Sequence, residues 1–85
     1  MSYKVILKPS AAKQIQRIEK KFQKKIISAA KKLVDDPRPH GYKKLVDEEG
    51  LYRFRVGIYR IIYEIYDADL IVNILQVKKR NERTY

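Results

Sequence analysis

The run from Leu51 to Tyr66 constrains the fold of this chain more than any other stretch. Its first half, LYRFRV, alternates large apolar and cationic side chains, the period-two pattern of a strand with one buried face. Gly57 and Ile58 follow as a two-residue turn with glycine in first place, which tight hairpins favour. The chain then returns through YRIIYEIY. The run therefore predicts an antiparallel hairpin over residues 51–66.

The predicted register of this hairpin gathers three arginines on one face. If Val56 faces Tyr59, then Arg55 faces Arg60, and Arg53 lies two residues further along the same side. The opposite face then carries apolar and aromatic side chains, namely Tyr52, Phe54, Val56, Tyr59, Ile61 and Tyr63. Like charges placed directly opposite each other destabilise a sheet. We therefore expect the arginine face to bind an anion, and to be concave and open to solvent.

The segment before the hairpin is predicted to be helical, after one short strand. Residues 3–7 form that strand, and Ser10 is expected to cap a helix that starts at Ala11. Two apolar stripes then follow at helical spacing: Ala12, Ile15, Ile18 and Phe22, then Phe22, Ile26, Ile27, Ala30, Leu33 and Val34. They predict either two helices with a break near Lys20 or one bent helix. The run DDPRP at 35–39 ends the helical region.

The segments after the helices complete an α+β domain. Residues 38–50 are expected to form an irregular polar connection to the hairpin. A third strand, over residues 70–77, is apolar on both sides and is expected to be central or covered on both faces. The predicted order is β-α-α-β-β-β, with two N-terminal helices packed on one face of a mainly antiparallel sheet. A length of 85 residues fits a single domain, residues 1–85.

The charge of the chain points to a polyanionic partner. The net charge is +10, and residues 1–34 hold ten basic residues and one acid, Glu19. Nucleic acid is the first expectation, ahead of an acidic protein or membrane surface. The chain has no cysteine, its N-terminus does not resemble a signal peptide, and no segment approaches the roughly 20 apolar residues of a membrane span. We therefore expect a soluble, cytoplasmic protein without a membrane partner.

Several kinds of catalytic site are missing from the sequence. It has no cysteine nucleophile, no glycine-rich phosphate loop and no pair of histidines, so we expect no metal and no cofactor. His40 is expected to be a surface residue, and the acids at 47–49 are expected to be turn residues. The remaining candidates are cationic: Arg53, Arg55, Arg60 and Arg80, whose guanidinium groups suit phosphate. Tyr66 and Tyr85 could stack on a base.

Three stretches resemble the RelE/ParE superfamily of toxins from toxin–antitoxin modules. They are LYRFRVGIYRIIYEI at 51–65, AAKQI at 11–15 and the closing VKKRNERTY, and the resemblance extends over essentially the whole chain. RelE-like members cut mRNA in the ribosomal A site, whereas ParE-like members poison DNA gyrase and lack the cationic cleft. The resemblance thus implies a RelE-like fold, a cognate antitoxin as partner, and, for the RelE branch, the ribosome and mRNA.

The resemblance also implies roles for individual residues. It places the catalytic residues of a metal-independent endoribonuclease at Arg53, Arg55, Arg60, Arg80 and Tyr85. Lys43, Lys44, Lys79 and Arg83 are added as candidate RNA-binding residues. Many relatives carry Gly-His-Arg where this chain has Lys78-Lys79-Arg80, so no imidazole is available there. The 2′-hydroxyl of the RNA would attack the neighbouring phosphorus, and Tyr85, Lys79 or the ribosome itself would transfer the protons.

Two other functions remain open on the sequence. One is a ParE-like inhibitor of DNA gyrase, which binds a protein target and cuts nothing. The other is a non-catalytic nucleic-acid-binding module that uses the basic helical layer. Such a module would bind polyanions with a steep salt dependence and leave RNA intact.

Overall fold

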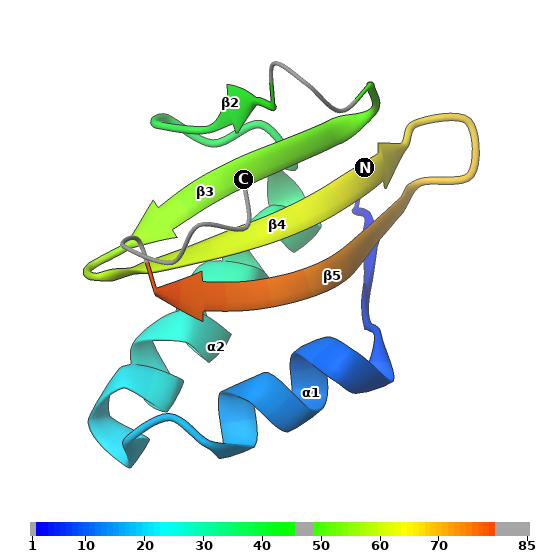
Figure 1. Ribbon diagram of the computed structural model, residues 1–85. Helices are drawn as coiled ribbons and strands as arrows, with labels where there is room; N and C mark the ends of the chain where they lie inside the picture. The colour runs from blue at the N-terminus through cyan, green and yellow to red at the C-terminus, as the bar shows by residue number, and fades with distance from the viewer. Residues whose placement is uncertain (1, 46–48, 80–85) are drawn as a thin grey trace.

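A five-stranded sheet carries two helices on one side (Figure 1). The structure is a computed structural model that describes residues 2–45 and 49–79. The elements are β1 (Lys4–Leu7), α1 (Pro9–Gln16), α2 (Lys20–Asp35), β2 (Lys43–Lys44), β3 (Leu51–Val56), β4 (Tyr59–Tyr66) and β5 (Ile71–Lys79). The α+β fold predicted from the sequence is confirmed. The two-residue strand β2 is an addition to it, because residues 38–50 were expected to be irregular.

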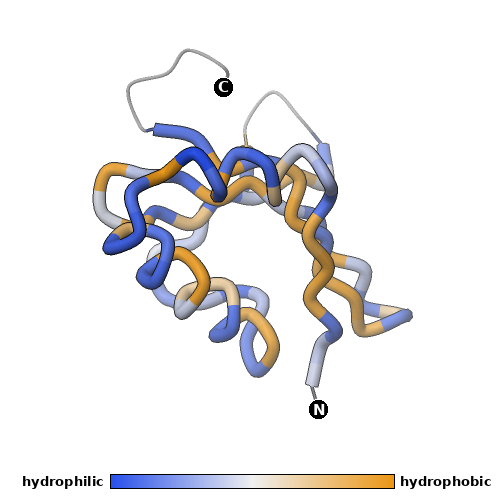
Figure 2. Tube along the Cα trace, turned by 90° about the horizontal axis from the view of Figure 1, so that it is seen from below, coloured by the Kyte–Doolittle hydropathy of each residue, from blue (hydrophilic) through white to orange (hydrophobic). Residues whose placement is uncertain are grey.

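The sheet has the strand order β1-β5-β4-β3-β2. Strand β1 pairs with β5 in parallel, and the other neighbouring strands pair antiparallel. Strand β5 therefore lies inside the sheet, between β1 and β4, in line with the prediction from the apolar run over residues 70–77. Figure 2 shows hydrophobic stretches along the strands, while the helices alternate between hydrophilic and hydrophobic turns. The main core lies between the sheet and the helices and includes Ile26, Leu33, Ile61 and Tyr63.

The helical region is broken into two helices without glycine or proline. Arg17 and Ile18 close α1 with short-range bonds to the carbonyl groups of Gln14 and Ile15. The side-chain amide of Gln23 then donates to the Ile18 carbonyl at 2.7 Å. The Ile18 carbonyl has no hydrogen-bond donor within α1, and the Gln23 side chain of α2 supplies one. The apolar stripes allowed either two helices or one bent helix, and the structure has two helices.

The start of α1 differs from the sequence prediction at Ser10. The helix begins at Pro9, which needs no hydrogen-bond acceptor in the first turn, and Lys8 is the N-cap. The Ser10 hydroxyl instead donates to the carbonyl of Leu75 in β5 at 3.1 Å. One turn later, the side-chain oxygen of Gln14 accepts from the Val77 backbone N–H at 2.7 Å. Two α1 side chains therefore bond the β5 backbone beyond Ile74, where β1 stops pairing with it.

An ion pair ties the end of the helical region to the turn between β4 and β5. Both terminal nitrogens of the Arg38 guanidinium donate to the Asp67 carboxylate, at 3.1 and 2.8 Å. The Tyr3 hydroxyl donates to the same carboxylate at 2.6 Å. Arg38 and Tyr3 together lower the pKa of Asp67 to about 2. Beside this cluster, the buried Tyr63 hydroxyl donates to the Pro37 carbonyl at 2.8 Å, and burial raises its pKa.

Candidate functional site

The β3–β4 hairpin has the register that its alternation predicts. Val56 pairs with Tyr59, Arg55 with Arg60, and Phe54 with Ile61. Gly57 has a φ of 60°, a conformation that glycine adopts without strain, so the two-residue turn closes as expected. Tyr59 and Tyr63 are buried on the helix side. Arg53, Arg55 and Arg60 consequently share the face of the sheet opposite the helices.

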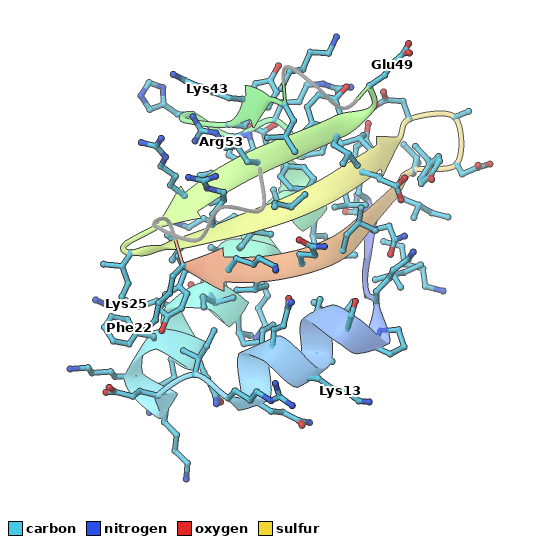
Figure 3. The ribbon with its side chains drawn as sticks, viewed as in Figure 1. Lys13, Phe22, Lys25, Lys43, Glu49 and Arg53 are labelled. Carbon is cyan, nitrogen blue, oxygen red and sulfur yellow. The ribbon has the colours of Figure 1, made fainter. Side chains whose placement is uncertain are left out.

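Neighbouring strands add two lysines to this face. Lys43 of β2 pairs with Arg53, and Lys78 of β5 pairs with Arg60 (Figure 3 labels Lys43 and Arg53). Paired residues project from the same side of a sheet, with about 5 Å between their Cβ atoms. We call these five residues, Lys43, Arg53, Arg55, Arg60 and Lys78, the cationic face. It crosses four strands at the end of the sheet that holds the β3–β4 turn.

The cationic face is partly exposed to solvent. Arg55 and Lys43 are exposed, and Arg53, Arg60 and Lys78 are half-buried. Within the described ranges 2–45 and 49–79, the ion pairs are Lys21–Glu19 and Arg38–Asp67, so Arg55 and Lys78 form none there. Arg55 therefore stands beside Arg60 without a carboxylate from this part of the chain to offset the repulsion. Arg55 is exposed to solvent, as expected for the arginine face. The concave shape of this face stays a prediction.

The register separates the candidate residues that the sequence grouped together. Lys44 pairs with Tyr52 and Lys79 with Tyr59, so both project from the helix side, away from the arginines. Lys78, which the sequence analysis did not name as a candidate, lies on the cationic face where Lys79 does not. Arg80, Arg83 and Tyr85 lie outside the described residues, and their roles stay predictions.

The other half of this sheet face is not cationic. Glu64 accepts from the Asn73 side chain at 3.2 Å, and a hydrogen bond to Glu64 raises the pKa of Tyr66. Tyr66 is 46% exposed but lies six residues from Arg60 along β4, which corresponds to roughly 20 Å. Tyr66 is therefore too far away to stack on a base whose phosphate is bound by Arg55 and Arg60.

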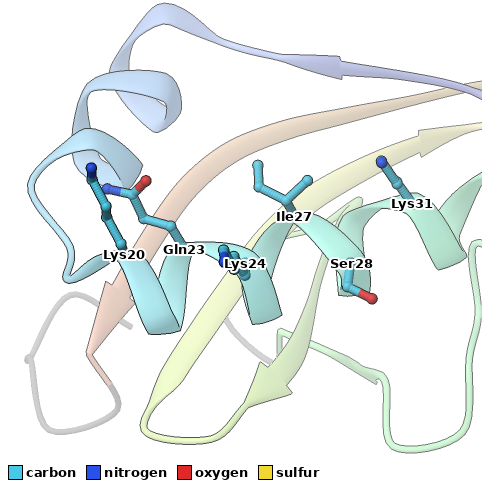
Figure 4. A pocket seen from close by; sticks show the side chains of 6 residues that line it. All are labelled: Lys20, Gln23, Lys24, Ile27, Ser28 and Lys31. Atoms are coloured by element: carbon cyan, nitrogen blue, oxygen red, sulfur yellow. The ribbon is translucent and has the colours of Figure 1, made fainter.

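A second basic surface runs along α2. Its exposed side forms a shallow groove of about 460 Å³ (Figure 4), lined by Lys20, Gln23, Lys24, Ile27, Ser28 and Lys31. Ile27, which the apolar stripe placed in the core, is 36% exposed in this groove, and Ala29 takes its place among the buried residues. The groove presents three cations from a single helix, with no strand residue among its lining. Such a groove suits a long polyanion better than it suits a single, tightly bound phosphate.

The described residues offer no alternative centre for metal chemistry. Within ranges 2–45 and 49–79, no three His, Asp or Glu side chains are grouped so that they could hold a metal ion. His40 is exposed, as expected from its loop. Among the described helices, none is long and apolar enough to cross a membrane.

The family of the chain follows from a comparison with known protein families. The model of the ParE toxin of type II toxin–antitoxin systems, parDE, matches residues 5–84 of the chain. The chain belongs to the ParE toxin family. It is thus a toxin of a type II toxin–antitoxin system within the RelE/ParE superfamily. A RelE-like toxin protein of Escherichia coli is 27% identical over 81 residues, which cover 94% of this ParE-family chain and 85% of the relative.

Solved structures of RelE proteins share the fold of this ParE-family toxin. The RelE–RelB complex of the archaeon Pyrococcus horikoshii matches with a TM-score of 0.84 and 29% identity, covering 96% of this chain and 99% of the matched chain. The toxin–antitoxin complex RelBE2 of Mycobacterium tuberculosis matches with a TM-score of 0.83 and 26% identity, covering 94% and 100%. These relatives confirm the RelE-like α+β fold that the sequence predicted.

Proposed function

We propose that this toxin is a ribosome-dependent endoribonuclease that cuts mRNA in the ribosomal A site. The observation that carries the proposal is the pairing of Arg55 with Arg60 on an accessible sheet face that Arg53 shares. A phosphodiester can accept charge-assisted hydrogen bonds from two guanidinium groups that neighbouring strands present on one face. The identity to RelE proteins of known structure supports the same function.

The chemistry that suits this face is attack by the substrate's own 2′-hydroxyl. The 2′-oxygen bonds to the adjacent phosphorus while the bond from phosphorus to the 5′-oxygen breaks, giving a 2′,3′-cyclic phosphate and a free 5′-hydroxyl. Arg53, Arg55 and Arg60 stabilise the extra negative charge on the phosphorus oxygens, and they also orient the strand. Guanidinium groups do not act as bases. Proton transfer therefore belongs to another group, with Tyr85 a remaining candidate in this chain.

A cognate antitoxin is the second part of the proposal. The Pyrococcus and Mycobacterium relatives were solved as complexes with their antitoxins. With its net charge of +10, this toxin suits an acidic or amphipathic partner segment. We propose that the antitoxin silences the toxin by covering the cationic face or by blocking the entry of RNA.

The test adds pure toxin to translating ribosomes and maps the mRNA ends by primer extension. Cleavage within A-site codons is the expected result, and a 2′-deoxy nucleotide at the scissile position should abolish it, because the attacking oxygen is gone. Intact mRNA together with inhibition of DNA supercoiling by purified gyrase would instead establish the gyrase-inhibitor function. Intact mRNA with gyrase unaffected, but salt-sensitive RNA binding, would leave a non-catalytic binding module.

A further inference from the structure

An extra residue in β5 changes which side chains reach the cationic face. Ile62 of β4 pairs with Gln76, whereas the next residue, Tyr63, pairs with Ile74, so Leu75 is inserted as a β-bulge. The core residues of β5 reflect this insertion, since Val72 and Ile74 are two apart but Val77 follows three residues later. Without the bulge, alternation would place Leu75 and Val77 on the outer face. With it, Gln76 and Lys78 lie there instead.

Helix α1 holds the bulge in this position. The Ser10 hydroxyl bonds the carbonyl of Leu75, and the Gln14 side chain bonds the N–H of Val77, so both backbone groups that flank Gln76 have partners on α1. The bulge lies where β1 ends and can no longer supply those bonds. The orientation of Gln76 and Lys78 is thus built into the contact between α1 and β5.

The bulge therefore completes a row of cations across three strands. Arg55 pairs with Arg60, and Arg60 pairs with Lys78. Neighbouring strands lie about 4.8 Å apart, so the row spans roughly 10 Å, which is longer than a single phosphate group. We propose that Arg55, Arg60 and Lys78 form one binding row for consecutive phosphates of a single RNA strand. Lys78 is then a substrate-binding residue; this assignment rests on the proposed function.

Gln76 supports RNA over a free phosphate as the ligand. Its side-chain oxygen is buried and, within the part of the chain that the structure describes, has no hydrogen-bond donor. It lies one step along the same face from Lys78, next to Ile62. A buried acceptor of this kind favours a ligand that brings a donor. A 2′-hydroxyl or a base amino group supplies one, whereas a fully ionised phosphate does not.

The test compares two neighbouring lysines that differ in the face they occupy. Lys78→Gln and Lys79→Gln remove the same charge one residue apart, the first on the cationic face and the second on the helix side. Binding of a short fluorescein-labelled single-stranded RNA is measured by anisotropy over a range of salt concentrations. Lys78→Gln should weaken binding about tenfold and reduce the salt slope by about 0.7, because one phosphate is no longer neutralised. Lys79→Gln should stay within about twofold, and Lys78→Arg should bind as the wild type does.

The outcomes distinguish a failure of the binding row from a failure of the proposed endoribonuclease function. Equal effects of the two glutamine variants, or no effect of Lys78→Gln, would overturn the row even if the wild type cuts mRNA on the ribosome. If the wild type leaves ribosome-bound mRNA intact but Lys78→Gln still weakens RNA binding selectively, the row stands and the endoribonuclease function fails. Thermal melts of both variants check that neither substitution disturbs the fold.

Discussion

At the scale of single residues, the Arg55–Arg60 pair shows a conflict between stability and function. The two cations face each other across the strands that close the hairpin, and Arg55 has no ion pair among the described residues. A cross-strand pair of like charges costs stability, on the order of 0.2–1 kcal/mol. Such a cost, placed on an accessible face, is expected where a ligand is to be bound.

The conflict predicts opposite effects of one substitution. Arg55→Gln should leave the free energy of unfolding unchanged or raise it by up to about 1 kcal/mol, because the repulsion is relieved. The same change should lower mRNA cleavage on ribosomes at least tenfold, because the phosphate then has one charged hydrogen-bond donor fewer. Urea unfolding and primer extension measure the two effects. Stability and activity that fall together would identify Arg55 as a structural residue.

The Arg38–Asp67 pair predicts how stability depends on pH. The folded pKa of Asp67 is about 2, below the ordinary value of roughly 3.9 for an unfolded chain. The ion pair therefore stabilises the fold fully above about pH 4, and this contribution is lost as the pH falls toward 2. Thermal melts of wild type and Arg38→Gln should differ at neutral pH and converge near pH 2.

A control variant separates this pair from the general effect of charge. Lys44→Gln removes the same charge from an exposed position in β2, where no ion pair is found among the described residues. Its difference from wild type should not shrink between pH 4 and 2. If the Arg38→Gln difference also stays constant over that range, the ion pair does not control the acid stability.

At the scale of elements, the sequence predicts what depends on local alternation and misses what depends on tertiary contacts. The hairpin register follows from the alternation and from Gly57, and both are local. The bulge at Leu75 does not follow from local alternation. Residues 70–77 are apolar on both sides, so either set of alternate residues could face the core. The backbone groups beside the bulge are bonded by Ser10 and Gln14, more than sixty residues earlier in the chain. The sequence therefore does not indicate that Lys78 lies on the cationic face, or that Lys79, a candidate RNA-binding residue, lies on the helix side.

The same contact explains why Ser10 was misread. A serine beside the start of a helix is a common N-cap, but here Pro9 begins the helix and Ser10 bonds β5. Strand β2 has a comparable origin, since its two lysines become a strand only through pairing with β3.

The contact between α1 and β5 predicts different effects for two glutamines of one helix. Gln14→Ala leaves the Val77 N–H without its acceptor and should lower the free energy of unfolding by about 1–3 kcal/mol. Gln16→Ala makes the same chemical change at an exposed position and should be nearly neutral. Urea unfolding of both variants measures this. A loss of stability for Gln14→Ala no larger than that for Gln16→Ala would show that the Gln14 side chain does not hold the bulge.

At the scale of the whole molecule, cationic side chains gather both on the sheet face and along α2, and Arg55 lines a hollow together with Lys24. The cationic face brings residues of four strands together, whereas the α2 groove spreads Lys20, Lys24 and Lys31 along one helix. We expect the groove to attract polyanions and raise the association rate, and the cationic face to hold the reacting strand. The net charge of +10 is thus only partly a property of the site.

This division predicts that the helix lysines affect binding more than chemistry. The triple change Lys20→Gln, Lys24→Gln and Lys31→Gln should weaken ribosome binding and reduce its salt slope, by roughly 0.7–0.9 for each phosphate that is no longer neutralised. The cleavage rate at saturating toxin should stay within about threefold of wild type. A rate that collapses at saturation, with binding unchanged, would place the groove in the reaction itself.

The most direct test of the cationic face as the reactive surface is the single-turnover rate of mRNA cleavage on programmed ribosomes with saturating toxin. Arg60 lies at the centre of the row, between Arg55 and Lys78. Arg60→Gln should slow cleavage by on the order of 10²–10³, as expected when one charge-stabilising donor is removed, while Lys44→Gln on the other face should cut at the wild-type rate. Cleavage by Arg60→Gln at the wild-type rate would contradict the assignment of the active site to this face.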